Sequence, residues 1–365
     1  MTTAVIGNGA GGCAAAVTLS ALGRPVRLAG RRAHRREAVE AARGLTLIES
    51  GTRSTATDIE LGEDPAAAVN GASHVVLMVP TPVIPAYAEL IAPALDPDAL
   101  VLLAPGHTGG VLAFLTALRA VRPTLAARIR VAETFTLPYV ARMTAPAEVT
   151  VWRRMRSLLV ASRPVNALPD FLDAFEPVFP DLTPVENVLV SSLSNPNAIL
   201  HPPGMLGNIG WIERTGGDFL YYREGITQGI GRIMAALDEE RLAIGRAYGF
   251  ELSPFLDLFE AAGLVEHDIR ARGDIALAVH ESGPNREIRS PSTMTDRYVA
   301  EDVGFGLVAM RALAERAGVT VPTMDALILL ASHVNAIDYG AEGLTAERLG
   351  IAGLHPDEIV ELARG

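Results

Sequence analysis

The N-terminal stretch Thr3-Ala4-Val5-Ile6-Gly7-Asn8-Gly9-Ala10-Gly11-Gly12 decides the expected fold of this 365-residue chain. A short β-prone run leads into a Gly-x-Gly-x-x-Gly pattern, and a helical stretch, 14–22, follows. In such a turn the first glycine allows a tight bend, the second lets the backbone approach a pyrophosphate, and the third lets helix and strand pack closely. The order strand, glycines, helix therefore predicts a dinucleotide site on residues 7–12, with the pyrophosphate at the helix N-terminus. A glycine-rich turn without a ligand is the alternative.

Apolar runs of strand length recur along the first half of the chain. The expected strands are 3–6, 26–29, 74–79, 100–103 and 129–132, and helical patterns between them include 65–69 and 110–121. This alternation predicts a doubly wound parallel sheet with helices on both faces. Helical patterns prevail later, at 186–200, 226–248, 254–262, 303–317 and 323–337. We therefore expect a Rossmann α/β domain, residues 1–184, and a mainly α-helical domain, residues 185–365.

Composition excludes several classes of protein. The formal net charge of −11 opposes nucleic-acid binding, which needs a basic face. Cys13 is the only cysteine, so no internal disulfide or cysteine metal cluster is possible, and no metal is expected. No apolar run reaches the length of a membrane span, and the run after Met1 ends in glycines rather than in a signal-peptide cleavage site. We expect a cytoplasmic protein with no nucleic-acid or membrane partner.

The end of the second expected strand bears on the choice of dinucleotide. NAD enzymes usually place Asp or Glu there to bind the ribose hydroxyls. This chain has Gly30-Arg31-Arg32, with no acid until Glu37. Because guanidinium groups suit a 2′-phosphate, we expect Arg31 and Arg32 to favour NADP(H) over NAD(H). The alternative is a solvated basic turn, since basic residues continue to position 36.

Two more loops follow strands at the sheet edge where open α/β folds bind ligands. Val79-Pro80-Thr81-Pro82 follows one strand, and Ala104-Pro105-Gly106-His107-Thr108-Gly109-Gly110 follows the next. We expect Pro80 and Gly106 to contact the cofactor. Ordinary turn residues are the alternative reading of both loops.

Hydride transfer needs orientation and one group that moves a proton, for which histidine is well suited. Of eight histidines, His201 has the most distinctive context: it ends a helical pattern and precedes Pro202 and Pro203, which predicts a position at a helix end. A core or capping histidine is the alternative. The segment Arg297-Tyr298-Val299-Ala300-Glu301-Asp302-Val303 supplies two acids, which would either orient an imidazole or complement a helix dipole.

Together these segments resemble the opine dehydrogenase family, in particular the bacterial N-(carboxyalkyl) amino acid dehydrogenases and the octopine/nopaline dehydrogenases. The resemblance covers essentially the whole chain. Besides the glycine turn, it is carried by 105–110, Glu133-Thr134, Val185-Glu186-Asn187-Val188-Leu189, Asn197-Ala198 with His201-Pro202, Tyr221-Tyr222-Arg223-Glu224-Gly225-Ile226-Thr227, and Arg297-Tyr298 with Glu301-Asp302-Val303. The Asn-Ala-x-x-His-Pro, Tyr-Tyr-x-Glu-Gly and Arg-Tyr-x-x-Glu-Asp elements are the specific ones.

The resemblance implies a homodimer of two-domain chains with substrates between the domains, and reductive condensation. The amine of an amino acid attacks an α-keto acid, water leaves, and NAD(P)H reduces the imine. His201 falls on the family's catalytic histidine, Asp302 on its aspartate partner, and Arg297 on an arginine that binds a substrate carboxylate. Two substrate carboxylates call for forked guanidinium groups, so Arg142 is a second candidate after Arg297.

Other pocket residues remain open to two interpretations. Tyr221 and Tyr222 are expected to line the substrate pocket, with packing as the equal alternative. His107 stands where relatives often have a small residue, and it is expected to touch nicotinamide or substrate, or else to face solvent.

Rival functions are a ketopantoate-reductase-like or 2-hydroxyacid dehydrogenase and, in another class, a non-catalytic NADP(H) sensor. The chain contains no lysine, which counts against the lysine-dependent mechanism of the first group. The sensor would bind cofactor without turnover.

Overall fold

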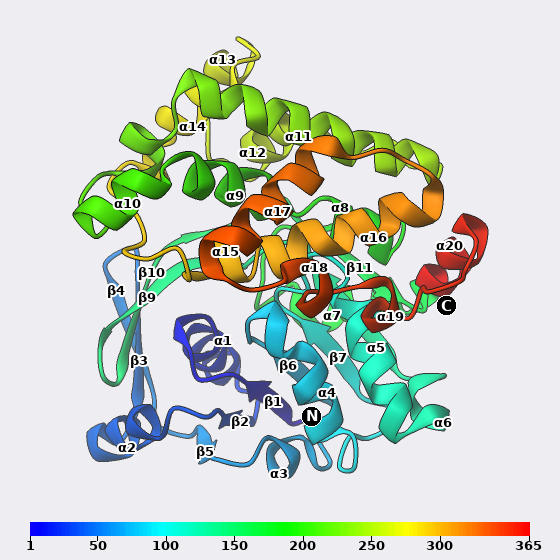
Figure 1. Ribbon diagram of the computed structural model, residues 1–365. Coiled ribbons are helices and arrows are strands. Elements are labelled where there is room, and N and C mark those ends of the chain that lie inside the picture. Colours follow the sequence, from blue (N-terminus) through cyan, green and yellow to red (C-terminus); the bar gives the residue numbers. More distant parts are fainter. The chain divides into compact units, whose positions relative to one another are not determined.

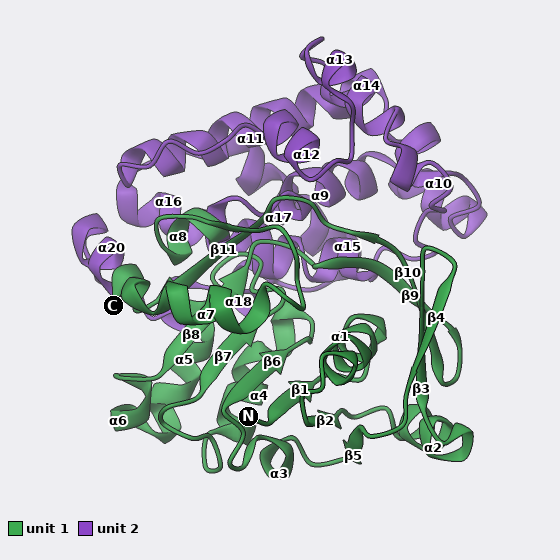
Figure 2. Cartoon of the chain, turned by 180° about the vertical axis from the view of Figure 1, so that it is seen from behind, with its two compact units in different colours: residues 1–191, 363–365 green, residues 192–362 purple.

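The computed structural model describes residues 1–365, which divide into two compact units (Figure 2). Unit 1 comprises residues 1–191 and 363–365, and unit 2 comprises residues 192–362. The domain boundary expected at 184/185 lies seven residues before this division, ahead of helix α8 (Val188–Leu193). Most of α8 groups with unit 1, where the hydroxyl of Ser191 donates to the Glu133 carboxylate over 2.8 Å.

An eight-stranded sheet, in the order β12-β11-β8-β7-β6-β1-β2-β5, forms the centre of unit 1. All neighbouring strands run parallel except β11, which is antiparallel to β8. Its strands are β1 (Thr3–Ile6), β2 (Val26–Ala29), β5 (Glu60–Gly62), β6 (His74–Leu77), β7 (Leu100–Leu103), β8 (Arg130–Thr134), β11 (Leu158–Arg163) and β12 (Leu182–Pro184). Strands β1, β6 and β7 are buried throughout, as expected of a parallel sheet covered on both faces. The predicted Rossmann-like sheet is confirmed.

The helices of unit 1 cover this sheet on both sides. In Figure 1, α4 and α5 lie in front of the sheet and α7 lies behind it. The helices are α1 (Ala10–Ala21), α2 (Ala33–Ala42), α3 (Pro65–Val69), α4 (Ile84–Ile91), α5 (Gly110–Val121), α6 (Pro123–Ala126) and α7 (Leu168–Phe175), with the 3₁₀ turns η1 (Thr81–Val83) and η2 (Val165–Ala167). Helix α1 contacts β1 and β2 of the large sheet and also strands of a second, smaller sheet. Its apolar and small residues on all sides fit burial between two layers.

The smaller sheet was not predicted from the sequence. It has the order β4-β3-β10-β9 and comprises β3 (Leu45–Glu49), β4 (Thr52–Ala56), β9 (Tyr139–Ala145) and β10 (Glu148–Arg154). Strand β4 is mostly exposed, so it lacks the apolar run that marks a buried strand. The sheet joins two hairpins through the parallel pair β3 and β10, in which Thr46 lies opposite Glu148. The pairing of such distant segments has no local signal, although Val149 and Val151 of β10 follow the alternation of a half-buried strand.

Unit 2 is helical, as predicted. Its elements are α9 (Asn197–Gly207), α10 (Ile209–Thr215), η3 (Tyr221–Gly225), α11 (Gln228–Ala247), α12 (Phe255–Ala261), α13 (His267–Arg270), α14 (Ile275–His280), η4 (Gly283–Asn285), α15 (Arg297–Ala300), η5 (Val303–Leu307), α16 (Val308–Ala317), α17 (Pro322–Asn335), α18 (Tyr339–Glu342), α19 (Ala346–Leu349) and α20 (Pro356–Arg364), the last of which ends in unit 1. Helix α11 contacts α9, α14, α16 and α17 and so forms the centre of the unit.

A fully buried arginine connects α11 to its surroundings. Arg241 bonds to Asp238 and donates to the carbonyls of Leu193 and Ser253. Asp238 in turn accepts from the backbone N–H of Phe255. Each charge in this cluster is therefore paired and hydrogen-bonded, as a buried ion requires.

The helix expected at 186–200 is wrong in detail. The structure has α8 and α9 with a break at residues 194–196, where Pro196 precedes the first residue of α9. His201 therefore lies inside α9 rather than at a helix end, and Pro202 and Pro203 are part of the same helix. Proline beyond the first turn removes a backbone hydrogen bond and crowds the carbonyl four residues earlier, so the packing of this buried helix has to offset both prolines.

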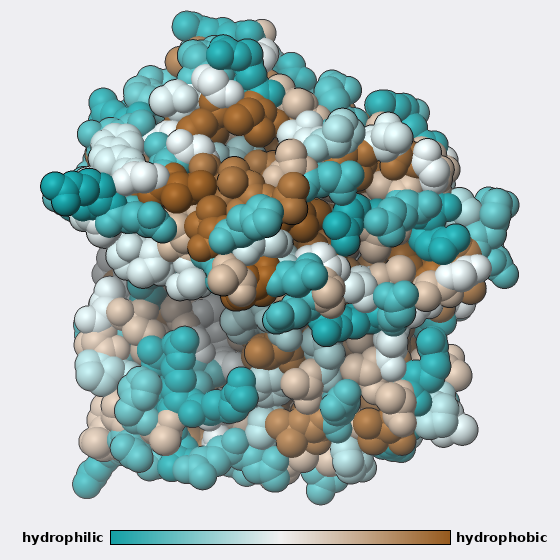
Figure 3. Space-filling model, viewed as in Figure 1, coloured by the Kyte–Doolittle hydropathy of each residue, from teal (hydrophilic) through white to brown (hydrophobic).

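The surface of unit 2 carries apolar side chains, which Figure 3 shows gathered over its helices. The large exposed apolar side chains of this unit are Trp211, Ile233, Leu329 and Leu330. None of the helices is both long and apolar enough to span a membrane.

Candidate active site

The glycine turn after β1 is shaped by close backbone contacts. Gly7 has φ of +117°, and a Cβ there would overlap the carbonyl oxygen of Met78. A Cβ on Gly12 would overlap the carbonyl oxygen of Gly7. Gly9, which caps α1, has open space where a Cβ would stand. Two glycines thus permit the packing of strand against helix, while the third leaves the N-terminus of α1 open to a ligand.

Asn8 ties the ends of β1 and β2 together. Its Nδ2 donates to the carbonyl of Arg32 over 3.0 Å, and its Oδ1 accepts from the Arg32 N–H over 3.4 Å. A Cβ on Gly30 would overlap the Asn8 side chain. Any side chain at position 30, an acid included, would therefore overlap Asn8.

The basic turn after β2 leaves two arginines unpaired. Arg31 and Arg32 are exposed and have no carboxylate partner, and the Arg31 guanidinium lies 5.7 Å from the centre of the Tyr87 ring. Arg35, which the sequence did not single out, donates to the backbone carbonyl of Asn8 over 2.6 Å. The turn thus combines one arginine that supports the glycine turn with two that are available to an anion.

The two loops that follow β6 and β7 are joined by a side-chain hydrogen bond. Thr81 Oγ1 lies 3.0 Å from His107 Nδ1, and both side chains are buried. His107 takes up the left-handed backbone region with φ of +53°, and Pro80 is exposed beside Thr81. In unit 1, His107 therefore links these loops and does not face solvent.

Glu133, at the carboxyl end of β8, is a buried acid that the sequence did not assign to the site. Its Oε2 accepts from the N–H of Val111 over 2.8 Å, and its Oε1 accepts from Ser191. A Cβ on Gly106 would overlap the Glu133 carboxylate. The carboxylate therefore lies at the positive end of α5 and determines the path of the loop that contains Gly106 and His107.

His201 and Asp302 meet in unit 2 although 101 positions separate them in sequence. Nδ1 of His201 lies 2.7 Å from Oδ2 of Asp302, and the exposed fractions of the two residues are 5% and 2%. A carboxylate at this distance keeps the proton on Nδ1 and stabilises an imidazolium when one forms. The pair has the arrangement that a general acid–base requires.

Two tyrosines complete the surroundings of this imidazole. The hydroxyl of Tyr222 lies 3.0 Å from Nε2 of His201 and 2.9 Å from the hydroxyl of Tyr298. The ring of Tyr298 stacks on the imidazole with 3.6 Å between centroids and 4° between planes. Burial raises the pKa of both tyrosines, so both hydroxyls keep their protons near neutral pH. We call His201, Asp302, Tyr222 and Tyr298 the His201 cluster.

The backbone around the cluster departs from α-helical geometry at two places. The N–H of Asp302 bonds to the carbonyl of Arg297, and the N–H of Leu307 bonds to the carbonyl of Asp302, which begins the π-helical segment η5. Tyr221 and Tyr222 open a second π-helical segment, η3. Such segments are frequent at functional sites because they re-aim side chains.

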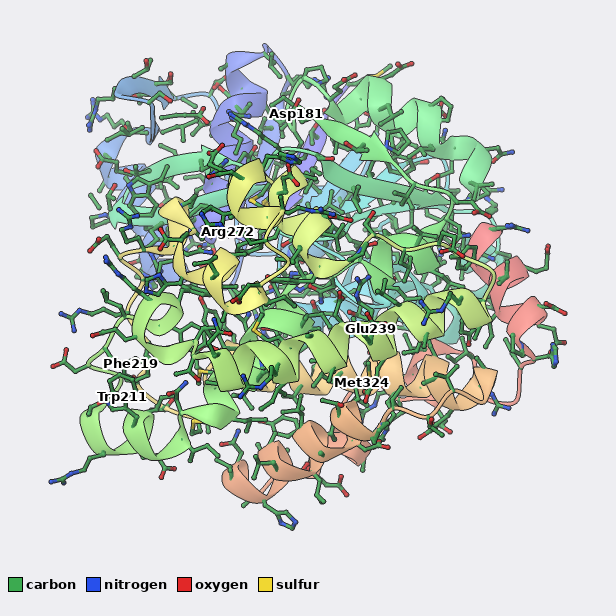
Figure 4. All side chains as sticks on the ribbon, turned by 90° about the horizontal axis from the view of Figure 1, so that it is seen from above. Asp181, Trp211, Phe219, Glu239, Arg272 and Met324 are labelled. Atoms are coloured by element: carbon green, nitrogen blue, oxygen red, sulfur yellow. The ribbon has the colours of Figure 1, made fainter.

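Packing around α9 holds His201 and the η3 segment in place. The hydroxyl of Tyr221 donates to the backbone carbonyl of His201 over 2.7 Å, and a Cβ on Gly204 would overlap that hydroxyl. Before η3, Phe219 stacks on Trp211 of α10 with 4.0 Å between ring centroids. Figure 4 labels these two side chains next to each other. Tyr221 therefore packs against α9 here, and its role in lining the substrate pocket stays a prediction.

The expected carboxylate-binding arginines lie on different units. Arg297, on α15, is about half exposed, and its Nε lies 3.5 Å from the buried Glu301 carboxylate. Burial lowers its pKa, but the Glu301 and Asp302 carboxylates outweigh burial and raise it, so the guanidinium stays charged. Arg142 is exposed on β9 of unit 1. No group of three or more His, Cys, Asp or Glu side chains is arranged to hold a metal ion.

Comparisons with known proteins match both halves of this chain. Residues 184–335 match the family model "NAD/NADP octopine/nopaline dehydrogenase, alpha-helical domain", and residues 2–113 match "NAD-dependent glycerol-3-phosphate dehydrogenase N-terminus". An opine dehydrogenase from Arthrobacter sp. (strain 1C) is 32% identical over 354 residues, which cover 97% of this chain and 96% of the relative.

Solved structures show the same fold at low sequence identity. Octopine dehydrogenase with NADH and L-arginine superposes with a TM-score of 0.81 at 20% identity, covering 98% of this chain and 97% of the other. Yersinopine dehydrogenase with NADP⁺ bound superposes with a TM-score of 0.76 at 17% identity, covering 100% and 98%.

Proposed function

Because this chain belongs to the opine dehydrogenase family, we propose that it uses NADPH to condense an α-keto acid reductively with an amino acid or another amine. It is an NAD(P)-dependent oxidoreductase of the type that acts on CH–NH bonds. The observation that carries the proposal is the buried pair of His201 and Asp302, with 2.7 Å between Nδ1 and Oδ2.

The residues of unit 1 fit a dinucleotide. Gly9 leaves the N-terminus of α1 free of side chains, and α1 has no acid in its first turn to compete with a pyrophosphate. Arg31 and Arg32 are unpaired and would hold a 2′-phosphate, which supports NADP(H) over NAD(H). Pro80 and Gly106 lie on loops at the carboxyl ends of β6 and β7, where they would border the nicotinamide. When bound, NADPH supplies the hydride that reduces the imine.

The His201–Asp302 pair performs the proton transfers of the condensation. As a base and then as an acid, the imidazole moves two protons, one after the other, from the amine nitrogen to the keto oxygen. The first turns the alkoxide of the adduct into the carbinolamine hydroxyl. The second protonates that hydroxyl, so that its C–O bond breaks, water leaves and the protonated imine remains. Asp302 offsets the charge of the intermediate imidazolium, and charged Arg297 would bind a substrate carboxylate.

The test follows the absorbance of the reduced nicotinamide with NADPH and, separately, NADH. Pyruvate or another α-keto acid is combined with a panel of amino acids and amines. We expect turnover only when both carbonyl and amine are present, and faster turnover with NADPH. Turnover with the keto acid alone would instead assign a 2-hydroxyacid dehydrogenase, and tight NADPH binding without turnover would support a sensor.

The homodimer and the cytoplasmic location remain predictions from resemblance and composition. Sedimentation equilibrium tests the first, because a mass of one chain in solution would contradict a dimer.

A further inference from the structure

Neither ring nitrogen of His201 is available to an outside group. Nδ1 lies 2.7 Å from Asp302, and Nε2 lies 3.0 Å from the Tyr222 hydroxyl. One face of the imidazole is covered by the stacked Tyr298 ring. A histidine that exchanges protons with substrate usually presents a free nitrogen to it. Here a proton leaving or reaching Nε2 meets the hydroxyl of Tyr222 first.

The Tyr222 hydroxyl is also hydrogen-bonded to a second hydroxyl, that of Tyr298. It lies 2.9 Å from the hydroxyl of Tyr298. Tyr222 is buried, with an exposed fraction of 4%, whereas Tyr298 is partly exposed. The three groups therefore form a hydrogen-bonded chain from a buried ring nitrogen to the hydroxyl of a more accessible residue.

We propose that the hydroxyls of Tyr222 and Tyr298 relay the proton between His201 and the substrate, with Tyr298 as the group that touches the reacting atoms. This inference rests on the proposed function of His201 as general acid–base. It adds Tyr298 as a catalytic residue and Tyr222 as the residue that connects it to the imidazole.

The relay balances in both directions. When the substrate amine loses a proton, that proton binds Tyr298 Oη while the Tyr298 proton moves to Tyr222 Oη and the Tyr222 proton moves to Nε2. In reverse, Nε2–H protonates Tyr222, Tyr222 protonates Tyr298, and Tyr298 protonates the oxygen of the adduct. The first such cycle forms the carbinolamine hydroxyl, and the second protonates that hydroxyl, so that its C–O bond breaks and water leaves. Both tyrosines are neutral before and after each pass, and the imidazolium is stabilised by Asp302 and by the π face of Tyr298.

The neighbouring Tyr221 shows what a purely structural tyrosine looks like at this site. Its hydroxyl donates to the backbone carbonyl of His201 over 2.7 Å and does not meet the imidazole nitrogens. Tyr222, in contrast, bonds at once to a ring nitrogen and to another hydroxyl. A chain of groups that each donate and accept is the arrangement that proton transfer requires.

The test compares Tyr222→Phe, Tyr298→Phe and the double variant in the full-length enzyme, with keto acid, amine and NADPH. We expect each single change to lower kcat by about 100-fold, the low end for general acid–base catalysis, while the Kd for NADPH stays within about twofold. Because the two hydroxyls act in series, the double variant should be within about threefold of the slower single variant. Replacing NADPH by its 4,4-dideuterated form should slow the wild type but not the variants, in which loss of water becomes rate-limiting.

Tyr248→Phe is the matched control, because it removes another tyrosine hydroxyl of unit 2, which donates to the carbonyl of Leu313 over 3.0 Å. It should leave kcat unchanged.

Two results would overturn the relay. One is a kcat within about threefold of wild type in both single variants. The other is a double variant whose loss of kcat equals the product of the two single losses, with the deuterium effect retained. Melting curves identify a variant that fails to fold. If Tyr222→Phe does not fold, Tyr298→Phe tests the relay, because Tyr298 is partly exposed. His201→Ala separates the two proposals: if it stays active, the proposed role of His201 fails, and if it is inactive while both tyrosine variants work, only the relay fails.

Discussion

The glycine turn of unit 1 is built from backbone, whereas the His201 cluster of unit 2 is built from side chains. In the turn, Gly7 and Gly12 matter for the atoms they lack, since a Cβ on either would overlap a main-chain oxygen. In the cluster, three side chains from two other stretches of chain surround the imidazole of His201. A site built from backbone is local in sequence and tolerates few residue types. A site built from side chains depends on distant segments, and its hydroxyl and carboxyl groups can be removed without changing the shape of the residues around them.

Asp302→Asn is expected to have the largest effect, a fall in kcat. The change removes the negative charge of the His201 cluster and leaves its volume the same. An amide cannot stabilise the imidazolium and, by donating to Nδ1, favours the wrong tautomer. We expect kcat to fall about 1,000-fold, equivalent to about 4 kcal/mol of transition-state stabilisation. The Kd for NADPH, measured by fluorescence titration, should stay within about twofold, since no residue of the glycine turn changes. A kcat within tenfold of wild type would remove Asp302 from the mechanism.

Gly12→Ala and Gly9→Ala form a matched pair that tests the backbone site. The Gly12 variant places a methyl group against the Gly7 carbonyl, so we expect a loss of about 2–3 kcal/mol in the free energy of unfolding. The Gly9 variant has room for its methyl group in the free protein, so its melting temperature should change little. That methyl group would stand where a pyrophosphate approaches, and the Kd for NADPH should rise about tenfold. Equal effects of the two changes on both measurements would contradict this division.

The two sites also differ in how far the sequence predicted them. The turn could be predicted because its strand, glycines and helix are consecutive, and the parallel sheet followed from apolar runs that alternate with helices. Three-dimensional packing was needed to find that Asn8 excludes an acid at position 30 and that Glu133 holds the α5 loop. These contacts join separate strands, so no spacing pattern predicts them.

The cluster was predicted in part: local context singled out His201, and the segment 297–303 offered two acids, but only the family resemblance paired His201 with Asp302. Tyr298 was part of a quoted motif but was not assigned a role, because stacking on a residue 97 positions earlier has no local signature. His201 was expected at a helix end because two prolines follow it, yet α9 continues to Gly207. Proline rules describe isolated helices better than a buried one whose surroundings hold it in place.

The double change Arg31→Ser and Arg32→Ser tests a third kind of contact, between exposed arginines and the 2′-phosphate that they are proposed to bind. We expect the Kd for NADPH to rise about tenfold or more and the Kd for NADH to stay within about twofold, because only the former carries the 2′-phosphate. Arg36→Ser is the control, since Arg36 already pairs with Glu40 and Glu63 and should leave both affinities unchanged. Equal losses for the two cofactors would show a general electrostatic effect instead.

Cys13→Ala is expected to have the smallest effect, a change in the pH dependence of the free energy of unfolding. The Cys13 side chain is buried in α1, directly after the glycine turn. Burial raises the pKa of the Cys13 thiol from 9.0 to about 12, although Arg35 and Arg32 oppose the shift. The folded protein therefore retains this proton above pH 9, where the unfolded chain releases it. The resulting stability is present below about pH 9 and is lost as the pH rises toward 12. Urea unfolding at about pH 8 and about pH 10 should show the wild type losing roughly 1 kcal/mol more than the variant. Tyrosines titrate equally in both proteins, so identical losses would show that the thiol does not contribute to the alkaline sensitivity of unit 1.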